Sequence, residues 1–319
     1  MFSNKLYHIF IYYNMKKFIM FTLIIISILV LINSNIVINS IIYSTKIFNN
    51  KIFPSLFPFF ILSELLINYG FIEFSSILFK PLMKLFKINS NCSFIFVMSM
   101  ISGFPSSAKY TKDLYDKKYI NSLEATKVLT FTHFSNPLFI LGFISLILNK
   151  KIGLYILIIH YLTNIIIGLI FRKIIKTDIN TNNKINNNYQ SFSNVLSNSI
   201  INGFKTLFLI LGTMIVFLTI TNLINKYIGL NPLLKGIFNG TLEMTGGINT
   251  ISNLNISLKL KSTLIGMILS FGGISVHMQI KSIISNTDIK YYPYLVARIL
   301  HSALTGLIIF NLYDLIIKT

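Results

Sequence analysis

The chain is poor in cysteine and in acidic residues. Its single cysteine, Cys92, excludes an intramolecular disulfide and a thiolate metal site. Only nine Asp and Glu residues stand against 28 Lys and Arg residues, which gives a formal net charge of +19. The sequence has no phosphate-binding loop, dinucleotide-binding glycine pattern or paired-carboxylate hydrolase arrangement. Any transport must therefore be passive, ion-coupled or driven by a partner.

The histidines and the basic residues both lack the patterns of ligand sites. The five histidines form no HExxH or other close ligand spacing, so we expect neither a metal nor another cofactor. The basic residues lie mostly in short loops between apolar runs, and no basic face carries stacking aromatics. We therefore expect anionic lipid headgroups, and not nucleic acid, as the partner of this charge.

Apolar sequence, in contrast, is abundant. Hydrophobic residues make up 53% of the 319 residues and charged ones only 12%, a balance that would expose too much nonpolar surface in a soluble domain. We therefore predict an all-α polytopic membrane protein. A basic stretch precedes the apolar run at residues 18–32, and no small-x-small cleavage site follows it. This pattern predicts an uncleaved first helix with its basic flank in the cytoplasm.

The apolar segments fall into two halves around a polar, asparagine-rich linker. The expected segments are residues 53–69, 94–104, 128–148 and 152–171 in the first half, and 206–224, 236–248, 264–284 and 295–313 in the second. Because a crossing needs about 20 residues, we expect three spans and one short, broken segment in each half. The predicted parts are residues 1–36 with the first helix, a first repeat at 37–172, the linker at 173–194 and a second repeat at 195–319.

Weak internal matches indicate that the second half repeats the first. The tripeptides that begin at Ser40 and Ser199 are 159 residues apart, and His160 and His301 are 141 residues apart. Three crossings per half is an odd number, so the second copy would be inverted, as in many secondary transporters. A genome biased towards Ile, Asn and Lys could produce the same matches, and the duplication stays open at this point.

Two stretches of Gly, Pro, Ser and Thr break the apolar pattern, and irregular backbone at membrane depth is tolerated only inside protein or beside a cavity. The candidate solute-binding residues of the first break are Ser102, Gly103, Pro105 and Lys109. Free amides and hydroxyls there suit an anionic or hydroxylated ligand, with Lys109 as its counter-charge. The alternative is a tight turn with a purely architectural role.

The second break has two parts, both in the second half. Its candidate residues are Glu243, Thr245, Gly246, Gly247, Gly272, Gly273 and Ser275. The glycines either unwind a helix beside Glu243 or simply let helices approach closely. A serine-hydrolase motif would need a second glycine where Val276 stands, and Ser275 and His277 are too close in sequence to share a helix face. We therefore expect no enzyme.

Isolated polar residues in other apolar segments are further candidates. Glu64 lies within a predicted span, where a carboxylate is either functional or paired, for example with a lysine. His133 and Asn136 lie just before Pro137 within another apolar segment, although such residues are more often helix–helix contacts than ligands. On the last span, Arg298 and His301 are candidate internal cations, unless Arg298 snorkels to the interface.

Most of these motifs belong to one ordered series over residues 41–313. The series comprises Pro54-Ser55-Leu56-Phe57-Pro58-Phe59-Phe60, Glu64-Leu65-Leu66, Pro81-Leu82-Met83, Ser102-Gly103-Phe104-Pro105, Ala108-Lys109, Glu124-Ala125, Asn136-Pro137-Leu138-Phe139, His160-Tyr161, Leu242-Glu243-Met244-Thr245, Phe271-Gly272-Gly273-Ile274-Ser275-Val276, Gln279 and Arg298. It resembles the sporulation integral membrane protein YlbJ family of the Gate (nucleoside-recognition) superfamily. Ser106-Ser107 and His133 depart from the family pattern. We add Gln279 to the candidate solute-binding residues.

The resemblance implies a role in spore cortex formation and a multi-pass location in the mother-cell or forespore-surrounding membrane. It implies no substrate, and the nucleoside label is a fold name. The first functional hypothesis is a transporter-like protein that binds or moves a small polar or anionic solute needed for the spore envelope. The alternative is a non-transporting scaffold that docks other sporulation membrane proteins.

Overall fold

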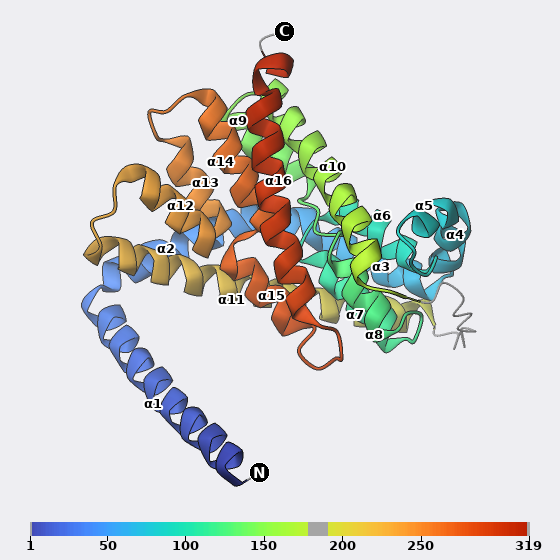
Figure 1. Ribbon diagram of the computed structural model, residues 1–319, viewed down its shortest axis with the longest axis horizontal. Helices are drawn as coiled ribbons and strands as arrows, with labels where there is room; N and C mark the ends of the chain where they lie inside the picture. The colour runs from blue at the N-terminus through green and yellow to red at the C-terminus, as the bar shows by residue number, and fades with distance from the viewer. Residues whose placement is uncertain (1, 178–190, 318–319) are drawn as a thin grey trace.

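The computed structural model describes residues 2–177 and 191–317, and these residues form helices and connecting loops without a strand (Figure 1). In the first half the helices are α1 (Phe2–Ile32), α2 (Ser34–Ile47), the π-helix η1 (Phe48–Ile52), α3 (Phe53–Asn68), α4 (Phe71–Leu78), α5 (Lys80–Leu85), α6 (Cys92–Ser102), α7 (Ser106–Asp116), α8 (Ser122–Leu129), the π-helix η2 (Phe139–Ile144), α9 (Ser145–Ile147) and α10 (Lys150–Ile174). In the second half they are α11 (Phe192–Tyr227), α12 (Pro232–Leu242), α13 (Met244–Ser252), α14 (Leu258–Phe271), α15 (Gly273–Ile283) and α16 (Tyr291–Ile317). Most of the predicted linker, including residues 180–188, lies outside the described residues.

Several helices are long and apolar enough to cross a membrane. Among the described residues, five candidate spans meet this test, and a sixth is formed if α2–η1 and α3, which are bent by 50°, count as one. The five are Met15–Ile32, Lys150–Ile174, Phe192–Tyr227, Leu258–Ile283 and Tyr291–Leu315. The prediction of an all-α polytopic membrane protein is therefore confirmed.

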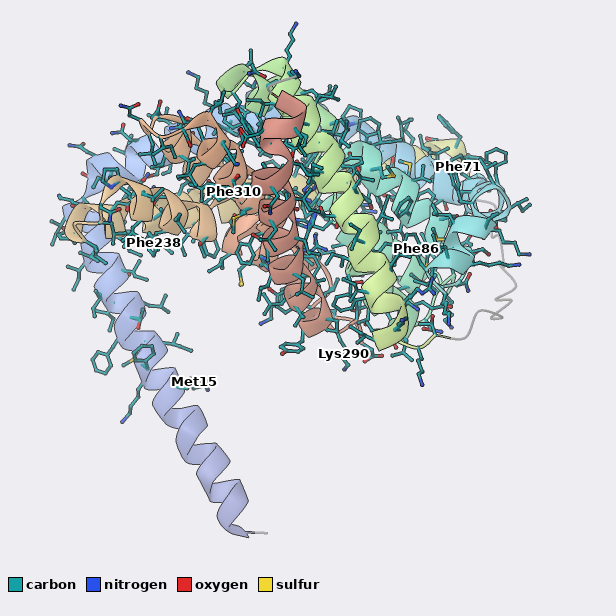
Figure 2. The ribbon with its side chains drawn as sticks, turned by 45° about the horizontal axis from the view of Figure 1, so that its top comes forward. Met15, Phe71, Phe86, Phe238, Lys290 and Phe310 are labelled. Carbon is teal, nitrogen blue, oxygen red and sulfur yellow. The ribbon has the colours of Figure 1, made fainter. Side chains whose placement is uncertain are left out.

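The helices form a body from which α1 projects. In Figure 1, α2, α3 and α11 run across the view, whereas α10, α14 and α16 run up it; α11 packs along α2 and α3, and α16 packs against α10 and α14. One hydrophobic core gathers aromatic rings such as Phe60, Phe94 and Phe131, and a second is rich in isoleucine. The apolar side chains of α1 around Met15 stand clear of both cores (Figure 2).

The structure corrects one predicted segment and adds a helix that was not predicted. Residues 128–148 do not form a span: α8 ends at Leu129, residues 132–136 are irregular, and a π-helix follows. Pro137 lacks an amide donor and disfavours a helical conformation at Asn136, which explains the interruption. The helix α2 was not predicted, because its serines and asparagines look polar. Its Ser40 is buried and accepts a hydrogen bond from Asn222 of α11 at 2.9 Å.

The order of elements is alike in the two halves. A long helical element (α2–η1–α3, or α11) comes before a broken pair (α6 and α7, or α12 and α13). A second interrupted element follows (α8 to η2, or α14 and α15), and then one unbroken helix (α10, or α16). The duplication and its domain bounds stay predictions.

Candidate functional site

Four backbone interruptions meet near the centre of the protein. Gly103 approaches the irregular segment before η2 so closely that a Cβ atom would lie 2.4 Å from the amide nitrogen of Asn136. Gly273 approaches the α12–α13 break in the same way, because its Cβ would lie 3.0 Å from the amide nitrogen of Met244. Gly103, Gly272 and Gly273 have φ values of 81°, 88° and 75°, which side chains rarely tolerate. The predicted first break therefore lies against the irregular segment 132–136, and the two parts of the second break lie against each other.

A cavity of about 70 Å³ lies where these interruptions meet. Its lining comes from both breaks, the irregular segment, η1, α3, α11 and α15: Lys51, Ile52, Leu56, Phe104, Pro105, Ser135, Asn136, Phe139, Ile210, Met214, Glu243, Met244, Thr245, Ser275, Val276 and Gln279. The candidates that the cavity brings together are Pro105, Asn136, Glu243, Thr245, Ser275 and Gln279. Residues from both halves of the sequence thus line one cavity, in which a few polar groups stand among apolar side chains.

Glu243 is the acidic residue of the cavity lining, and it forms the whole break between α12 and α13. Its backbone is extended (φ −142°, ψ 119°), and its side chain caps α13. Its Oε2 accepts hydrogen bonds from the Thr245 hydroxyl at 2.6 Å and from the Gly246 amide at 2.7 Å. A carboxylate at this position also interacts favourably with the N-terminus of α13. Burial raises the pKa of Glu243, which lies outside the candidate spans.

The other polar residues of the lining differ in whether their side chains already form hydrogen bonds within the protein. Asn136 donates to the carbonyl oxygen of Ser102 at 3.1 Å and accepts from the amide of Leu138 at 2.7 Å, so it fastens the irregular segment to the first break. Gln279 donates to the Thr213 hydroxyl of α11 at 2.9 Å. Among the residues that the structure describes, the buried hydroxyl of Ser275 has no hydrogen-bond partner. It is therefore the group most open to a solute.

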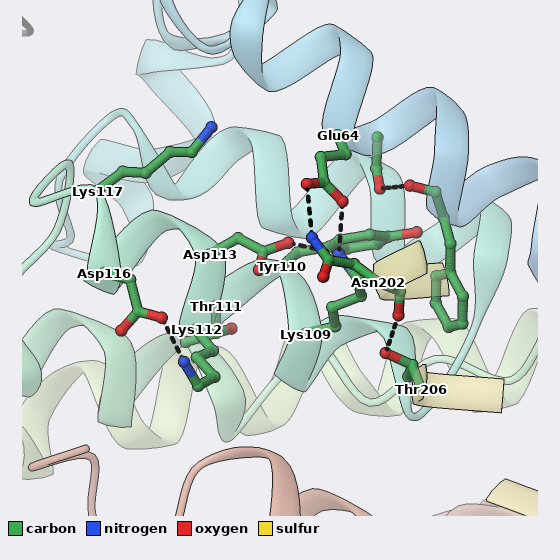
Figure 3. A network of polar contacts seen from close by, with 12 residues as sticks. Glu64, Lys109, Tyr110, Thr111, Lys112, Asp113, Asp116, Lys117, Asn202 and Thr206 are labelled. Atoms are coloured by element: carbon green, nitrogen blue, oxygen red, sulfur yellow. Dashed lines mark hydrogen bonds and ion pairs between the residues drawn. The ribbon is translucent and has the colours of Figure 1, made fainter. Parts of the chain in front are cut away.

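Glu64 and Lys109 belong to a separate network (Figure 3). The ammonium of Lys109 lies 2.8 Å from Asp113 and 3.6 Å from Glu64, and the amide of Asn202 donates to Glu64 at 3.0 Å. Glu64 is thus paired with a lysine, the alternative that the sequence left open. Neither residue lines the cavity, and two carboxylates already balance Lys109. A role of Lys109 as counter-charge to a bound anion stays a prediction that this arrangement does not favour.

The remaining candidates shape the surroundings of the cavity. Ser102 accepts a hydrogen bond from Tyr110 at 3.0 Å and donates to a backbone carbonyl within α6. A Cβ atom on Gly247 would lie 2.1 Å from the Cα atom of Gly240, so this glycine lets α13 approach α12 closely. The backbone amide of Gly246 donates a hydrogen bond to the carboxylate of Glu243. These positions therefore act through hydrogen bonds and close backbone packing around the cavity.

His133 stands one layer behind the cavity. Its ring stacks on Phe104 at 4.2 Å, and its Nδ1 lies 2.8 Å from the hydroxyl of Tyr294. Its Nε2 has no hydrogen-bond partner among the described residues. A Cβ atom on Gly272 would lie 3.0 Å from that Nε2. Phe104, and not His133, contributes to the lining.

Arg298 lies behind His133 and is completely buried, so it does not snorkel. Its guanidinium donates to Asn164 at 3.2 Å, to Nδ1 of His301 at 2.8 Å and to the carbonyl oxygen of Thr130, and no carboxylate pairs with it among the described residues. Because His301 Nδ1 accepts from a guanidinium, His301 is neutral in this arrangement, contrary to the expectation of a second cation. No sequence pattern predicted a role for Asn164, which accepts from Arg298 in this network.

The sequence also matches a characterised relative. Sporulation integral membrane protein YlbJ of Bacillus subtilis (strain 168) is 30% identical to the chain, over 82% of this chain and 74% of that protein. No protein-family model and no solved structure matches the chain. Among the described residues, no group of three or more His, Cys, Asp or Glu side chains is placed to hold a metal ion. The extent of the match shows that the chain belongs to the family of sporulation integral membrane protein YlbJ, as a multi-pass membrane protein.

Proposed function

We propose that the protein is a transporter-like sporulation protein that binds, and moves across a membrane surrounding the forespore, a small polar or anionic solute used in spore cortex formation. The observation that carries this proposal is the cavity at the crossing of four backbone interruptions. Interrupted helices from two halves of a chain, meeting at one site, are the usual construction of a secondary-transporter binding site. This arrangement also supports the Gate-type fold that the motif order implies.

The size of the cavity limits what it holds in this state. A volume of about 70 Å³ accommodates a few water molecules, whereas pockets for drug-sized ligands measure roughly 300–1,000 Å³. A nucleoside would therefore require the helices to separate. A small solute that accepts hydrogen bonds from Ser275 and Gln279 fits the lining better, and the exposed Lys51 adds a positive charge at its edge.

A catalytic role has no support in this arrangement, and we propose that the protein is not an enzyme. The two ring nitrogens of His277 lie 2.7 Å from the Tyr291 hydroxyl and 3.1 Å from the carbonyl oxygen of Phe271. Both are therefore engaged away from Ser275, so His277 does not act as the base that a nucleophilic serine needs.

Docking of other sporulation membrane proteins is the second candidate function. The apolar window Met15–Ile32 of α1 has none of its residues buried against the body. A lone helix of this kind is free to pack against lipid or against a partner helix. Anionic lipids remain the expected partner of the basic loops.

Uptake by reconstituted protein tests the proposal. Purified protein in liposomes would be assayed with labelled inorganic phosphate, succinate, glutamate, glucose and uridine, with protein-free liposomes as the control. We expect uptake or exchange of at least one anion and little movement of uridine. No movement of any solute, together with a stable co-purifying membrane protein, would favour docking.

Replacing Ser275 by alanine is expected to weaken binding of the transported solute without loss of stability. This hydroxyl has no hydrogen-bond partner among the described residues, so its removal leaves no other group without a hydrogen bond. One hydrogen bond is worth about 0.5–1.5 kcal/mol, which corresponds to roughly 2- to 12-fold in affinity. The half-saturation concentration of uptake measures this loss. Ser302→Ala is the matched control, because Ser302 donates to the carbonyl oxygen of Met267 outside the cavity and should leave uptake unchanged.

A further inference from the structure

We propose that Glu243 binds a proton together with the anionic solute, so that movement of the solute is coupled to protons. This inference rests on the proposed function and goes beyond it by naming the coupling ion. Glu243 is 2% exposed and lines the cavity, and it makes no ion pair among the described residues. A solute that enters this space therefore meets a carboxyl group without a cation beside it.

Few charged or titratable groups face Glu243. Lys51 of η1 is the other ionisable residue of the lining, and its side chain is exposed to solvent. Tyr43 of α2 interacts electrostatically with Glu243. The residues that α11, α13 and α15 contribute to the lining are all uncharged. Among the described residues, none of these elements thus supplies a cation that pairs with an ionised Glu243.

An anion in so small a space would lie close to the carboxylate. Two like charges that share a buried site disfavour their joint ionisation, and one of them takes up a proton. Burial acts in the same direction, because it already raises the pKa of Glu243. The solute and the proton therefore stabilise each other in the cavity: each binds better when the other is present.

The hydrogen bonds of Glu243 are compatible with both protonation states. Thr245 and Gly246 donate to the same oxygen, Oε2. A neutral carboxyl group keeps one acceptor oxygen, so Oε2 retains both bonds while the proton is carried by the other oxygen. The cap of α13 therefore persists when the proton binds.

A line of polar groups connects Glu243 with one end of α11. Gly246, whose amide donates to Glu243, accepts at its carbonyl from Thr250 at 2.8 Å, and Thr250 accepts from Asn239 at 3.1 Å. Asn239 in turn accepts from Asn225 at 2.7 Å, close to the end of α11 at Tyr227. The Oδ1 atom of Asn225 is buried and accepts no hydrogen bond from the described residues. Apart from Glu243 this line has no ionisable side chain, so it holds the surroundings of the carboxylate in place and does not itself carry the proton.

Infrared difference spectroscopy tests whether Glu243 binds a proton, and it needs no knowledge of the natural solute. Reconstituted protein would be titrated with and without inorganic phosphate, a probe anion that has no carbonyl group. We expect a carbonyl band of a protonated carboxyl group that grows on acidification and on addition of phosphate. The part of the band that responds to phosphate should disappear in Glu243→Gln and remain in Glu73→Gln, a control acid on α4 outside the cavity. Absence of this band at every pH, its persistence in Glu243→Gln, or no response to phosphate would overturn the proposal.

A proton-flux measurement separates this inference from the proposed function. With a pH dye inside the liposomes, solute entry should acidify the lumen in the wild type and in Glu73→Gln. A gradient of about one pH unit should drive roughly tenfold accumulation of a solute that moves with one proton, and Glu243→Gln should lose this accumulation. Uptake without proton movement would refute coupling and leave transport standing. A Glu243 band without any uptake would refute transport and leave the proton site standing.

Discussion

Replacing Gly103 with alanine is expected to prevent the protein from folding stably in the membrane. The added Cβ atom would lie 2.4 Å from the amide nitrogen of Asn136 and 2.9 Å from its Cα atom. Both are backbone atoms, so no side-chain rotation relieves the contact. The backbone of Gly103 also has φ 81° and ψ −178°, a combination almost restricted to glycine. Strain and overpacking together should cost on the order of 4 kcal/mol, a large part of the stability of a typical domain.

The matched control is Gly212→Ala in α11, where an added Cβ atom meets nothing within 4 Å. Alanine is favoured over glycine inside a helix by about 1 kcal/mol, so this variant should be at least as stable as the wild type. Membrane yield and the temperature of aggregation in detergent, followed by size-exclusion chromatography, compare the two. Equal yields for Gly103→Ala and Gly212→Ala would show that the first break is not held against Asn136 as the structure has it.

The breaks could be predicted from sequence because their chemistry is local. Glycine, proline and serine within apolar sequence disfavour a continuous helix wherever they occur, so Gly103 and Gly273 stand out without any tertiary information. Their pairing could not be predicted in the same way. Gly103 meets Asn136, and Gly273 meets Met244, through contacts between distant segments. The cavity is a product of those contacts, and half of the residues in its lining are ordinary apolar ones.

The failures have equally physical causes. Residues 128–148 are apolar enough for a span, but hydropathy alone does not register the rigid conformation that Pro137 imposes. The helix α2 escaped notice for the opposite reason, because polar side chains such as Ser40 are buried against α11. Average hydropathy identifies helices that face lipid. It misses a helix whose polar side chains are buried against another helix, as Ser40 of α2 is.

Replacing Arg298 with methionine is expected to destabilise the protein by about 3 kcal/mol or more. The guanidinium joins α16 to the neighbouring elements through Asn164, the carbonyl oxygen of Thr130 and, within α16, His301. Methionine fills much of the volume but leaves these three acceptors without their donor, and each buried unpaired group costs roughly 1–3 kcal/mol. Lysine should rescue only part of the loss, because an ammonium group does not reproduce the planar fork of donors.

Thermal unfolding in detergent measures the effect, and Lys259→Met is its matched control. Lys259 pairs with Asp314 at 2.7 Å on the partly exposed surface, where an ion pair contributes at most about 1 kcal/mol. The Arg298 variant should therefore unfold at a clearly lower temperature than the Lys259 variant. If the Arg298 and Lys259 variants unfold at the same temperature, the three acceptors do not depend on the guanidinium for their stability. The role of Arg298, which pairs with no carboxylate among the described residues, would then lie in its charge. A chain of contacts through Tyr294, His133 and Phe104 links Arg298 to the cavity lining. That charge would then act on the solute, and the same variant would lower anion uptake while its fold stayed intact.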